Sequence, residues 1–344
     1  METVAGKLPK QGIRAVAAHA GVSTASVSRA LNSPDTVSAE LRRRITKAVR
    51  SVGYIPHAPA RAMSTRRTRT LGAIIPTIDN TMFARGIAAL QEYLSSVGYM
   101  LLLTTSGYDL DAELEQARNL ISRGVDGLVL RGDCHHDELR KTLADHALPF
   151  INVGVYRPDR PYPCVGTNNE AAAHRAAKHV IDLGHRKIGI VSALQRNNDR
   201  ASARVAGFHR ALSENGIALP PQWQVEVPYT LDDAREAARY LLSLDERPTA
   251  VVCGNDVIAY GVLLEGERSG FSVPRDLSVV GFDDLDWSRH LRPSLTTIQI
   301  PTGSTWQRAG EYLVRHLAGE QTIMHHEVDY SLIVRESTAP PQQR

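Results

Sequence analysis

The chain is 344 residues long and 42% hydrophobic, which is enough for two or three domains with well-filled cores. Its apolar runs are far too short to span a membrane, and residues 1–12 lack the apolar stretch of a signal peptide, so we expect a cytoplasmic protein. The three cysteines are widely spaced and form no C-x-x-C pair, which favours reduced thiols over a disulfide framework.

Charge is unevenly distributed along the chain, although the net charge is only +3. Residues 1–70 contain 13 Lys and Arg against 3 Asp and Glu, whereas residues 71–344 contain 27 against 34. A basic segment joined to an acidic remainder indicates that the N-terminal part alone has a polyanion as its partner. Binding of this kind depends strongly on salt.

Residues 13–32 follow an expected leader at 1–12 and have the pattern of a helix-turn-helix. Apolar and small residues recur at helical spacing as far as Ala20, Gly21 supplies the tight turn, and Ser23 is a suitable N-cap for a second helix. Near its start this second helix turns four side chains outward, where a recognition helix meets base edges: Thr24, Ala25, Ser28 and Arg29. An ordinary helical hairpin would show the same pattern.

Residues 38–53 predict a third helix, capped by Ser38 and ended by Gly53. Its outer face is basic and either contacts DNA phosphates or is simply solvated; it carries Arg42, Arg43, Arg44, Lys47 and Arg50. Residues 54–70 have the composition of a linker. Within it, residues 59–63 can form a short helix that requires a surface to order it.

From Leu71 onward, short apolar runs alternate with amphipathic helices in two series of similar length. The expected strands are 71–75, 100–104, 127–130, 150–155, 187–192, 225–227, 250–253 and 277–282. The expected helices lie near 82–97, 110–123, 137–147, 170–183, 200–215, 231–244 and 256–269. This order predicts an α/β fold with two like subdomains, each a parallel sheet covered on both faces. Ligands of such sheets bind at the carboxyl ends of the strands, here in a cleft between the subdomains.

In their order along the chain, these segments resemble the LacI/GalR family of bacterial transcription regulators over about residues 13 to 335. The matching stretches are IRAVAAHAGVSTASVSRALN, GYIPHAPARAM, GVDGLVL, LGHRKIGIV, RVAGF, CGNDVIAYGVL, VPRDLSVVGFDD and RPSLTTI. The resemblance implies a homodimer with a helix-turn-helix head, a hinge helix, and two Rossmann-like parallel-sheet subdomains of the periplasmic-binding-protein type. The implied divisions are a head at 13–55, a hinge and linker at 56–69, a body at 70–335 (one subdomain about 70–165 and 299–327, the other about 166–298 and 328–335) and a tail at 336–344.

The resemblance also implies residues that contact DNA. Thr24, Ala25 and Arg29 take the base-reading positions, and the chemistry agrees, since Arg29 can form a fork onto guanine O6 and N7. Phosphate contact is the alternative for Arg29. In the hinge, Arg61 is assigned to DNA binding, and Met63 stands where the family usually has a leucine that wedges into the minor groove. An exposed linker residue is the alternative for Met63.

The effector site implied by the resemblance comprises Phe83, Asn168, Arg204, Asp256 and Asp283. Arg131 and Arg196, with Arg157 and Arg200, fall at strand ends or in loops that border the same cleft. Structural alternatives stand beside these roles, because Phe83 fits a core position, Asp256 fits a helix cap and Arg204 fits a helix surface. Several arginines favour an anionic ligand, and a sugar acid is our hypothesis for the effector.

The competing classes are an enzyme and a secreted solute-binding protein. The sequence has no G-x-G-x-x-G after a strand, no Walker loop, and neither H-E-x-x-H nor G-x-S-x-G. Adjacent histidines at 135–136 and 325–326 lack a second matching pair, so we expect neither a metal nor a cofactor. The sequence therefore predicts a repressor of a carbohydrate or sugar-acid catabolic operon, which binds a pseudo-palindromic DNA operator as a dimer and responds to a small sugar-type effector.

Overall fold

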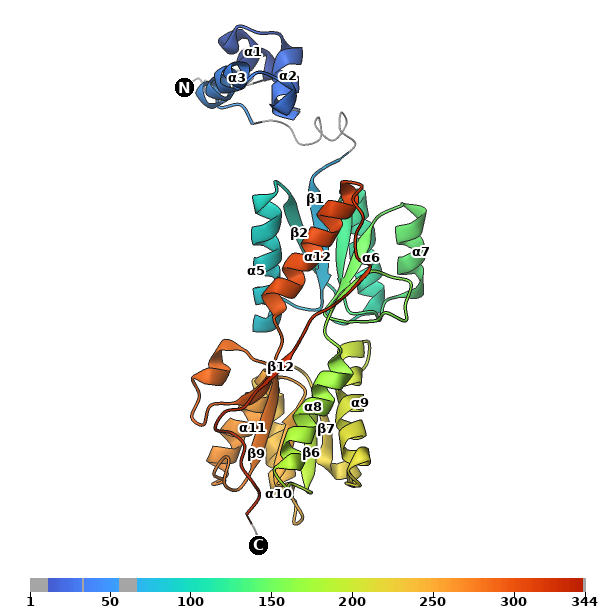
Figure 1. Cartoon of the computed structure of the whole chain (residues 1–344), viewed down its shortest axis with the longest axis vertical. Helices are drawn as coiled ribbons and strands as arrows, with labels where there is room; N and C mark the ends of the chain where they lie inside the picture. The colour runs from blue at the N-terminus through green and yellow to red at the C-terminus, as the bar shows by residue number, and fades with distance from the viewer. Residues whose placement is uncertain (1–11, 33, 56–66, 343–344) are drawn as a thin grey trace, which may run out of the picture. The chain divides into compact units, whose positions relative to one another are not determined.

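The structure is a computed structural model that describes residues 12–32, 34–55 and 67–342 (Figure 1). It divides into two compact units, Met1–Arg69 and Thr70–Arg344, which we call the head and the body. The expected hinge helix at residues 59–63, with Arg61 and Met63, lies outside the described residues.

In the head, helices α1 (Ile13–Ala20), α2 (Thr24–Asn32) and α3 (Ala39–Val52) pack around a small apolar core. The turn between α1 and α2 depends on Gly21, whose φ of 61° is left-handed and therefore favours glycine. Ser23 accepts a hydrogen bond from the Ser26 N–H at 3.1 Å, and Ser38 caps α3 through the Leu41 N–H at 3.3 Å. The predicted helix-turn-helix and its caps are confirmed.

The described residues of the body form two six-stranded sheets. The first sheet, with the order β11-β5-β4-β3-β1-β2, is parallel throughout and belongs to the part that we call the N-subdomain. Its strands are β1 (Thr70–Ile75), β2 (Met100–Thr105), β3 (Gly127–Arg131), β4 (Phe150–Val153), β5 (Cys164–Gly166) and β11 (His325–Glu327). Helices α5 (Thr81–Ser96) and α12 (Thr302–Leu317) cover one face, and α6 (Leu110–Ser122) and α7 (Asp137–Asp145) cover the other.

The second sheet, with the order β12-β10-β9-β8-β6-β7, belongs to the C-subdomain and is parallel except for β12. Its strands are β6 (Ile188–Ala193), β7 (Gln224–Val227), β8 (Ala250–Cys253), β9 (Ser278–Asp283), β10 (Thr296–Gln299) and β12 (Ser331–Ile333). Helices α8 (Asn169–Asp182) and α9 (Asp199–Glu214) pack on one face, and α10 (Leu231–Ser243) and α11 (Asp256–Arg268) pack on the other. The chain passes between the subdomains after β5, after β10 and after β11.

The α/β architecture and the expected strands and helices are confirmed, with ends that shift by a few residues. Four strands, β5, β10, β11 and β12, and the helix α12 were not predicted from the sequence. The four strands have only three or four residues each, which is too short for a clear alternation of polar and apolar positions. Among the described residues, no helix combines the length and the apolar character that a membrane span requires.

A buried carboxylate, that of Asp256, holds the first turn of α11 against the loop after β9 and against β10. Its Oδ2 accepts hydrogen bonds from the Leu285 N–H at 2.7 Å and the Ser288 hydroxyl at 2.6 Å, and its Oδ1 accepts from the Thr297 hydroxyl at 2.6 Å. From the sequence, Asp256 was expected either to cap a helix or to contact the effector, and neither expectation describes this position. The cap of α11 is Asn255, and the Asp256 carboxylate is fully enclosed by its own chain.

Replacing Asp256 by Asn should change how stability depends on pH. Burial raises the pKa of Asp256 from its ordinary 3.8 to about 7, so the folded protein binds an extra proton between these values. This residue therefore contributes stability below about pH 4, and the contribution is lost as the pH rises through 7. From urea titrations, we expect the free energy of unfolding to fall across this window less steeply for Asp256→Asn than for the unsubstituted chain. The two slopes of the free energy of unfolding against pH should differ by up to about 1.4 kcal/mol per pH unit.

The control for this experiment is Asp232→Asn, because the Asp232 side chain is 94% exposed. We expect its pH profile to match that of the unsubstituted chain. If the free energy of unfolding of Asp256→Asn changed with pH as steeply as that of the unsubstituted chain, the raised pKa assigned to Asp256 would be contradicted.

Candidate functional site: a basic head and an arginine-lined cleft

The exposed face of α2 carries the side chains predicted to read DNA. Thr24, Ala25 and Arg29 are exposed, while Ser28 is half-buried and accepts a hydrogen bond from the Asn32 side-chain amide at 3.2 Å. Ser28 is thus partly engaged within its own helix, and the other three are free to meet a ligand. Hydroxyl, methyl and guanidinium groups at the start of a helix are suited to base edges in a major groove.

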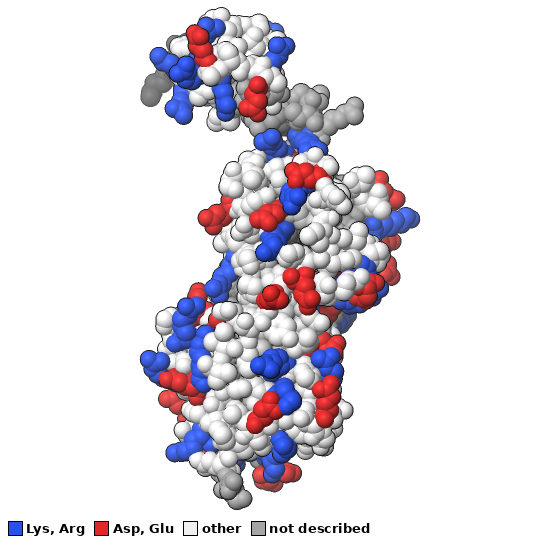
Figure 2. Space-filling view, viewed as in Figure 1, with Lys and Arg blue, Asp and Glu red and all other residues white. Residues whose placement is uncertain are grey.

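Helix α3 adds basic charge to the same unit. Its side chains Arg42, Arg43, Arg44, Lys47 and Arg50 are all exposed, as the apolar stripe on the opposite face requires. Figure 2 shows basic groups spread over the visible face of the head with a few acidic groups among them, and both signs interspersed over the body. Exposed guanidinium and ammonium groups of this kind can bind a phosphate backbone.

In the body, the carboxyl ends of strands from both sheets supply a cluster around Arg204, which projects from α9. Its Nε donates to the Asn169 side-chain oxygen at 3.1 Å, one Nη donates to the Gly254 carbonyl at 2.6 Å, and the other lies 3.3 Å from Asp283 Oδ1. The guanidinium also stacks 3.7 Å from the centroid of the Phe282 ring. Each contact fixes the plane of the guanidinium, which is 5% exposed.

Arg131, the last residue of β3, approaches this cluster from the N-subdomain. Its Nη1 donates to the Val153 carbonyl at 3.0 Å, and its guanidinium lies 5.5 Å from the centroid of the Phe83 ring. Only glycine fits beside it, because a Cβ on Gly154 would lie 1.3 Å from Nη1. Burial and the neighbouring charge of Arg200 lower the pKa of Arg131.

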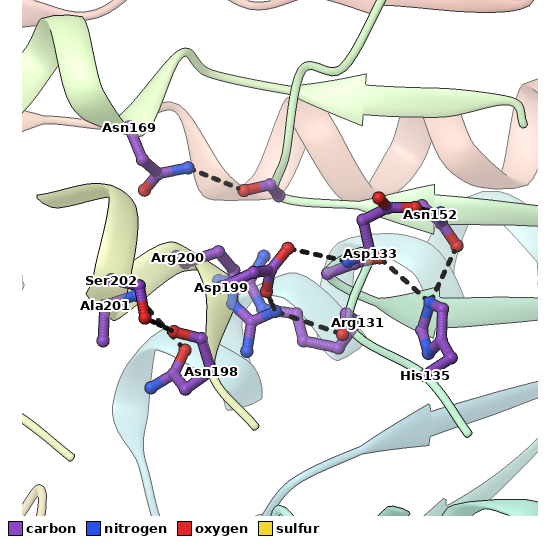
Figure 3. Close-up of polar contacts among 12 residues, drawn as sticks. Arg131, Asp133, His135, Asn152, Asn169, Asn198, Asp199, Arg200, Ala201 and Ser202 are labelled. Atoms are coloured by element: carbon purple, nitrogen blue, oxygen red, sulfur yellow. Dashed lines mark hydrogen bonds and ion pairs between the residues drawn. The ribbon is translucent and has the colours of Figure 1, made fainter. Parts of the chain in front are cut away.

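Contacts between the two subdomains converge on the first turn of α9, as Figure 3 shows. Asp199 pairs with its neighbour Arg200 at 2.6 Å and accepts a hydrogen bond from the Asp133 N–H of the N-subdomain at 2.8 Å. Arg200 in turn donates to the Arg131 carbonyl at 3.2 Å. These contacts hold the carboxyl edge of one sheet against the carboxyl edge of the other.

The loop that receives Asp199 is itself held by a buried histidine. His135 places Nδ1 3.0 Å from the Glu113 carboxylate and Nε2 3.2 Å from the Asn152 side-chain oxygen, and the Asn152 amide donates to Asp133 at 3.1 Å. Burial by itself lowers the pKa of His135, but the hydrogen bond to Glu113, the charge of Glu113 and the further contacts with Asn152 and Asp199 together raise it. His135 is therefore a structural residue of the cleft. Among the described residues, no group of His, Cys, Asp and Glu side chains is arranged to hold a metal ion.

Beside the arginines lies a cavity of about 480 Å³ with walls from both subdomains. Tyr108 follows β2, Tyr229 follows β7, and their rings face each other with centroids 6.4 Å apart. Asn197 donates to the Tyr108 carbonyl at 3.0 Å, and both residues have left-handed backbones, with φ of 55° and 63°. Non-glycine residues held in this conformation are concentrated at functional sites.

The structure brings together only some of the predicted effector residues. Arg131, Arg204 and Asp283 line one small cavity, and Arg196 lines the large one. Phe83 is 1% exposed and belongs to the core beneath Arg131. Asn168 is exposed and caps α8 by accepting from the Ala171 N–H, and its neighbour Asn169 is the residue that reaches Arg204.

Sequence reasoning missed Tyr108, Asn169 and Tyr229, and it named Arg200 only as a cleft border. Both tyrosines lie within three residues of a strand's carboxyl end, which is the same signal that selected Arg131. Aromatic residues flanked by glycine or proline at such positions, as in SGYD and VPYT, were therefore available as candidates.

Two family models match this chain. Residues 12–57 match the bacterial regulatory proteins of the lacI family, and residues 177–338 match the periplasmic binding protein-like domain. The catabolite control protein A of Priestia megaterium is 32% identical over 286 residues, which cover 83% of this chain and 86% of that protein.

The transcriptional repressor CytR of Escherichia coli K12 is 32% identical over 329 residues, covering 94% of this chain and 95% of that protein. Among solved structures, a complex of the transcriptional regulator CelR with cellobiose is 26% identical and has a TM-score of 0.71, covering 95% of this chain and 99% of that one.

The alignment with a single relative, CytR, thus covers both the helix-turn-helix head and the two-subdomain body. The relatives regulate transcription and are not enzymes. The chain belongs to the LacI family, and it is a DNA-binding transcriptional repressor.

Proposed function

We propose that this repressor binds a pseudo-palindromic operator in the cytoplasm as a homodimer and responds to a sugar or sugar acid held in the cleft between its subdomains. The controlled genes would be those of a carbohydrate or sugar-acid catabolic operon. The observation that carries the proposal is the cleft itself, where Arg204, Asp283 and Asn169 meet beside a large cavity walled by Tyr108 and Tyr229. Fixed polar groups beside aromatic faces are the features of a small-molecule site.

The chemistry of this cleft suits a ligand rich in hydroxyl groups. A carboxylate and an amide oxygen accept from hydroxyls, arginine donates to them, and a tyrosine ring provides a flat apolar face for the C–H groups of a sugar. The complex of the related CelR with cellobiose supports a carbohydrate-type ligand. We infer that Arg131, Arg196, Arg204 and Asp283 contact the effector, and that Phe83, Asn168 and Asp256 act only through the positions of neighbouring residues.

The proposed response is a change in how the two subdomains are arranged. The connections after β5, β10 and β11 are where the chain bends if the cleft opens, while the Asp199 and Asn197 contacts must break. A ligand shifts this equilibrium only by its difference in affinity for the two arrangements. By linkage, effector and operator change each other's affinity by the same factor.

For the head, we propose that α2 enters the major groove and that Thr24 and Arg29 carry most of the direct base reading. Ala25 offers only an apolar contact, and the Ser28 hydroxyl already interacts with Asn32. Arg61 and Met63 stay assigned to the minor groove through the family pattern, with Met63 as the wedge.

Arg29→Ala should weaken operator binding while leaving effector affinity unchanged. A bidentate contact from arginine to guanine is worth roughly 1–3 kcal/mol, and a dimer loses two of them. Fluorescence anisotropy with the intergenic DNA beside the gene, mapped first by footprinting, measures the loss. The control is Arg275→Ala, an exposed arginine of the body, which should bind as the unsubstituted protein does. Normal operator affinity in Arg29→Ala would refute the assignment.

Arg204→Ala should abolish the effector response and leave a dimer that binds operator. Hydrogen bonds to charged groups are worth about 1.5–3 kcal/mol each, so effector affinity should fall at least roughly tenfold. The measurement is operator anisotropy while titrating cellobiose, D-glucose, D-gluconate and D-galacturonate as probes. Arg210→Ala is the matched control, since Arg210 is an exposed arginine on the same helix. Retention of the response in Arg204→Ala would place the effector elsewhere.

A further inference from the structure

We propose that the effector is a hydroxy acid of the sugar-acid class, whose carboxylate binds Arg131 and whose adjacent hydroxyl donates to Asp283. The inference rests on the proposed function, because it concerns the same cleft, and it assigns each end of the ligand to one residue.

The first observation is that Arg131 has no counterion. Among the residues that the structure describes, no carboxylate lies within ion-pair distance of its guanidinium, and its Nε is buried with no hydrogen-bond acceptor. Its other contacts are the Val153 carbonyl and, at 3.8 Å, the Met82 sulfur. Arg131 is half-buried and its Nε is fully buried, and a charge withdrawn this far from water is costly without a counterion, so the site favours an anion that arrives from outside.

The neighbouring arginines, in contrast, each have a carboxylate counterion. Arg200 is paired with Asp199, and Arg204 donates to Asn169, Gly254 and Asp283. Arg131 is therefore the cation of this cluster that lacks a carboxylate counterion within the described chain. Its two forked donors match the two oxygens of a carboxylate.

The second observation concerns Asp283. Its Oδ1 lies 3.3 Å from Arg204, but its Oδ2 is buried and, in the described part of the chain, has no hydrogen-bond donor. The residue is 3% exposed and has a φ of 109°, so the backbone is strained to hold the carboxylate there. An acceptor without a donor requires an O–H or N–H group, and a hydroxyl supplies one.

The third observation is that Arg131 and Asp283, the two residues with unpaired atoms, line the same cavity. Arg131, Asn169, Arg204 and Asp283 line a space of about 20 Å³. A space of this size holds about one water-sized group, so the carboxylate and the adjacent hydroxyl of the ligand enter together only as the two subdomains move apart. Arg131 also lines a second small space with Tyr108 and Arg200, so the rest of the ligand can extend toward the large cavity that the two tyrosines line.

Charge balance points the same way. The charged residues that line the small space are the cations Arg131 and Arg204 and the carboxylate Asp283, which leaves one positive charge in excess there. A ligand with a single carboxylate neutralises this excess. A neutral sugar would accept hydrogen bonds from Arg131 but would leave this charge uncompensated.

The test uses isothermal titration calorimetry on the full-length dimer with matched probes. D-Gluconate, D-galactonate, D-glucuronate and D-galacturonate carry both groups, sorbitol and galactitol lack the carboxylate, and hexanoate lacks the hydroxyls. We expect at least one acid to bind, and its neutral counterpart and hexanoate to bind at least about tenfold more weakly. Binding to none of the acids, or equal binding of an acid and its neutral counterpart, would overturn the proposal.

Three variants test whether Arg131 binds the carboxylate of the ligand and Asp283 binds its hydroxyl. Arg131→Gln should weaken the acid at least about tenfold and remove the preference over the neutral probe, whereas Arg131→Lys should retain part of that preference. Asp283→Asn should weaken the acid but leave its preference over the neutral probe. Arg175→Gln, an exposed arginine on α8, is the control and should bind normally. Unchanged binding of the acid to Arg131→Gln would overturn the assignment.

Thermal unfolding without ligand separates a binding role for Arg131 from a structural one. Because Arg131 is a half-buried charge without a counterion, Arg131→Gln should melt at the same temperature as the unsubstituted protein or higher. A lower melting temperature, together with unchanged discrimination between acid and neutral probes, would show that Arg131 only holds the fold.

Operator binding distinguishes failure of this inference from failure of the proposed function. If operator is bound and a neutral sugar alone changes its affinity, the repressor function stands and the hydroxy-acid class is wrong. If the protein does not bind the operator, the proposed function fails whatever the calorimetry shows.

Discussion

The effector cleft depends on one buried guanidinium, that of Arg204. It joins α9 to the start of α8 through Asn169, to the end of β8 through the Gly254 carbonyl, and to the end of β9 through Asp283. Parallel strands leave their carboxyl ends at one edge of a sheet, and a polar group buried there is costly unless each of its donors is used. By satisfying these donors, the C-subdomain presents a rigid polar wall, against which the N-subdomain places Arg131.

The contacts across the cleft are few, and each is weak enough to break. The Asp133 N–H donates to the Asp199 carboxylate and Arg200 donates to the Arg131 carbonyl, and hydrogen bonds to charged groups are worth about 1.5–3 kcal/mol each. The neutral hydrogen bond from the Asn197 amide to the Tyr108 carbonyl is worth about 1 kcal/mol. A ligand with a modest difference in affinity can therefore shift the arrangement of the subdomains. The unpaired Nε of Arg131 and Oδ2 of Asp283 lie at this junction, so the cleft retains an electrostatic cost that a complementary ligand removes.

The head could be predicted almost completely from the sequence, because its determinants are local. The turn at Gly21, the caps at Ser23 and Ser38, and the exposed positions of Thr24, Ala25 and Arg29 follow from helical spacing within forty residues. Most strands and helices of the body were predicted for the same reason, although β5, β10 and α12 were not. Short edge strands such as β11 and β12 were not, because three residues carry too little pattern and their pairing is decided by distant segments.

The sequence by itself determined the family, the order of elements and the arginine-rich character of the cleft. Only the tertiary structure decided which side chains face it. Asn169 replaces Asn168 because the first turn of α8 uses one asparagine as its cap and turns the other toward Arg204. Asp256 is enclosed by hydroxyls from β10 and the loop after β9, and Phe83 lies in the core. Whether a charge is paired depends on residues distant in sequence, so the missing counterion of Arg131 becomes visible only when the chain is folded.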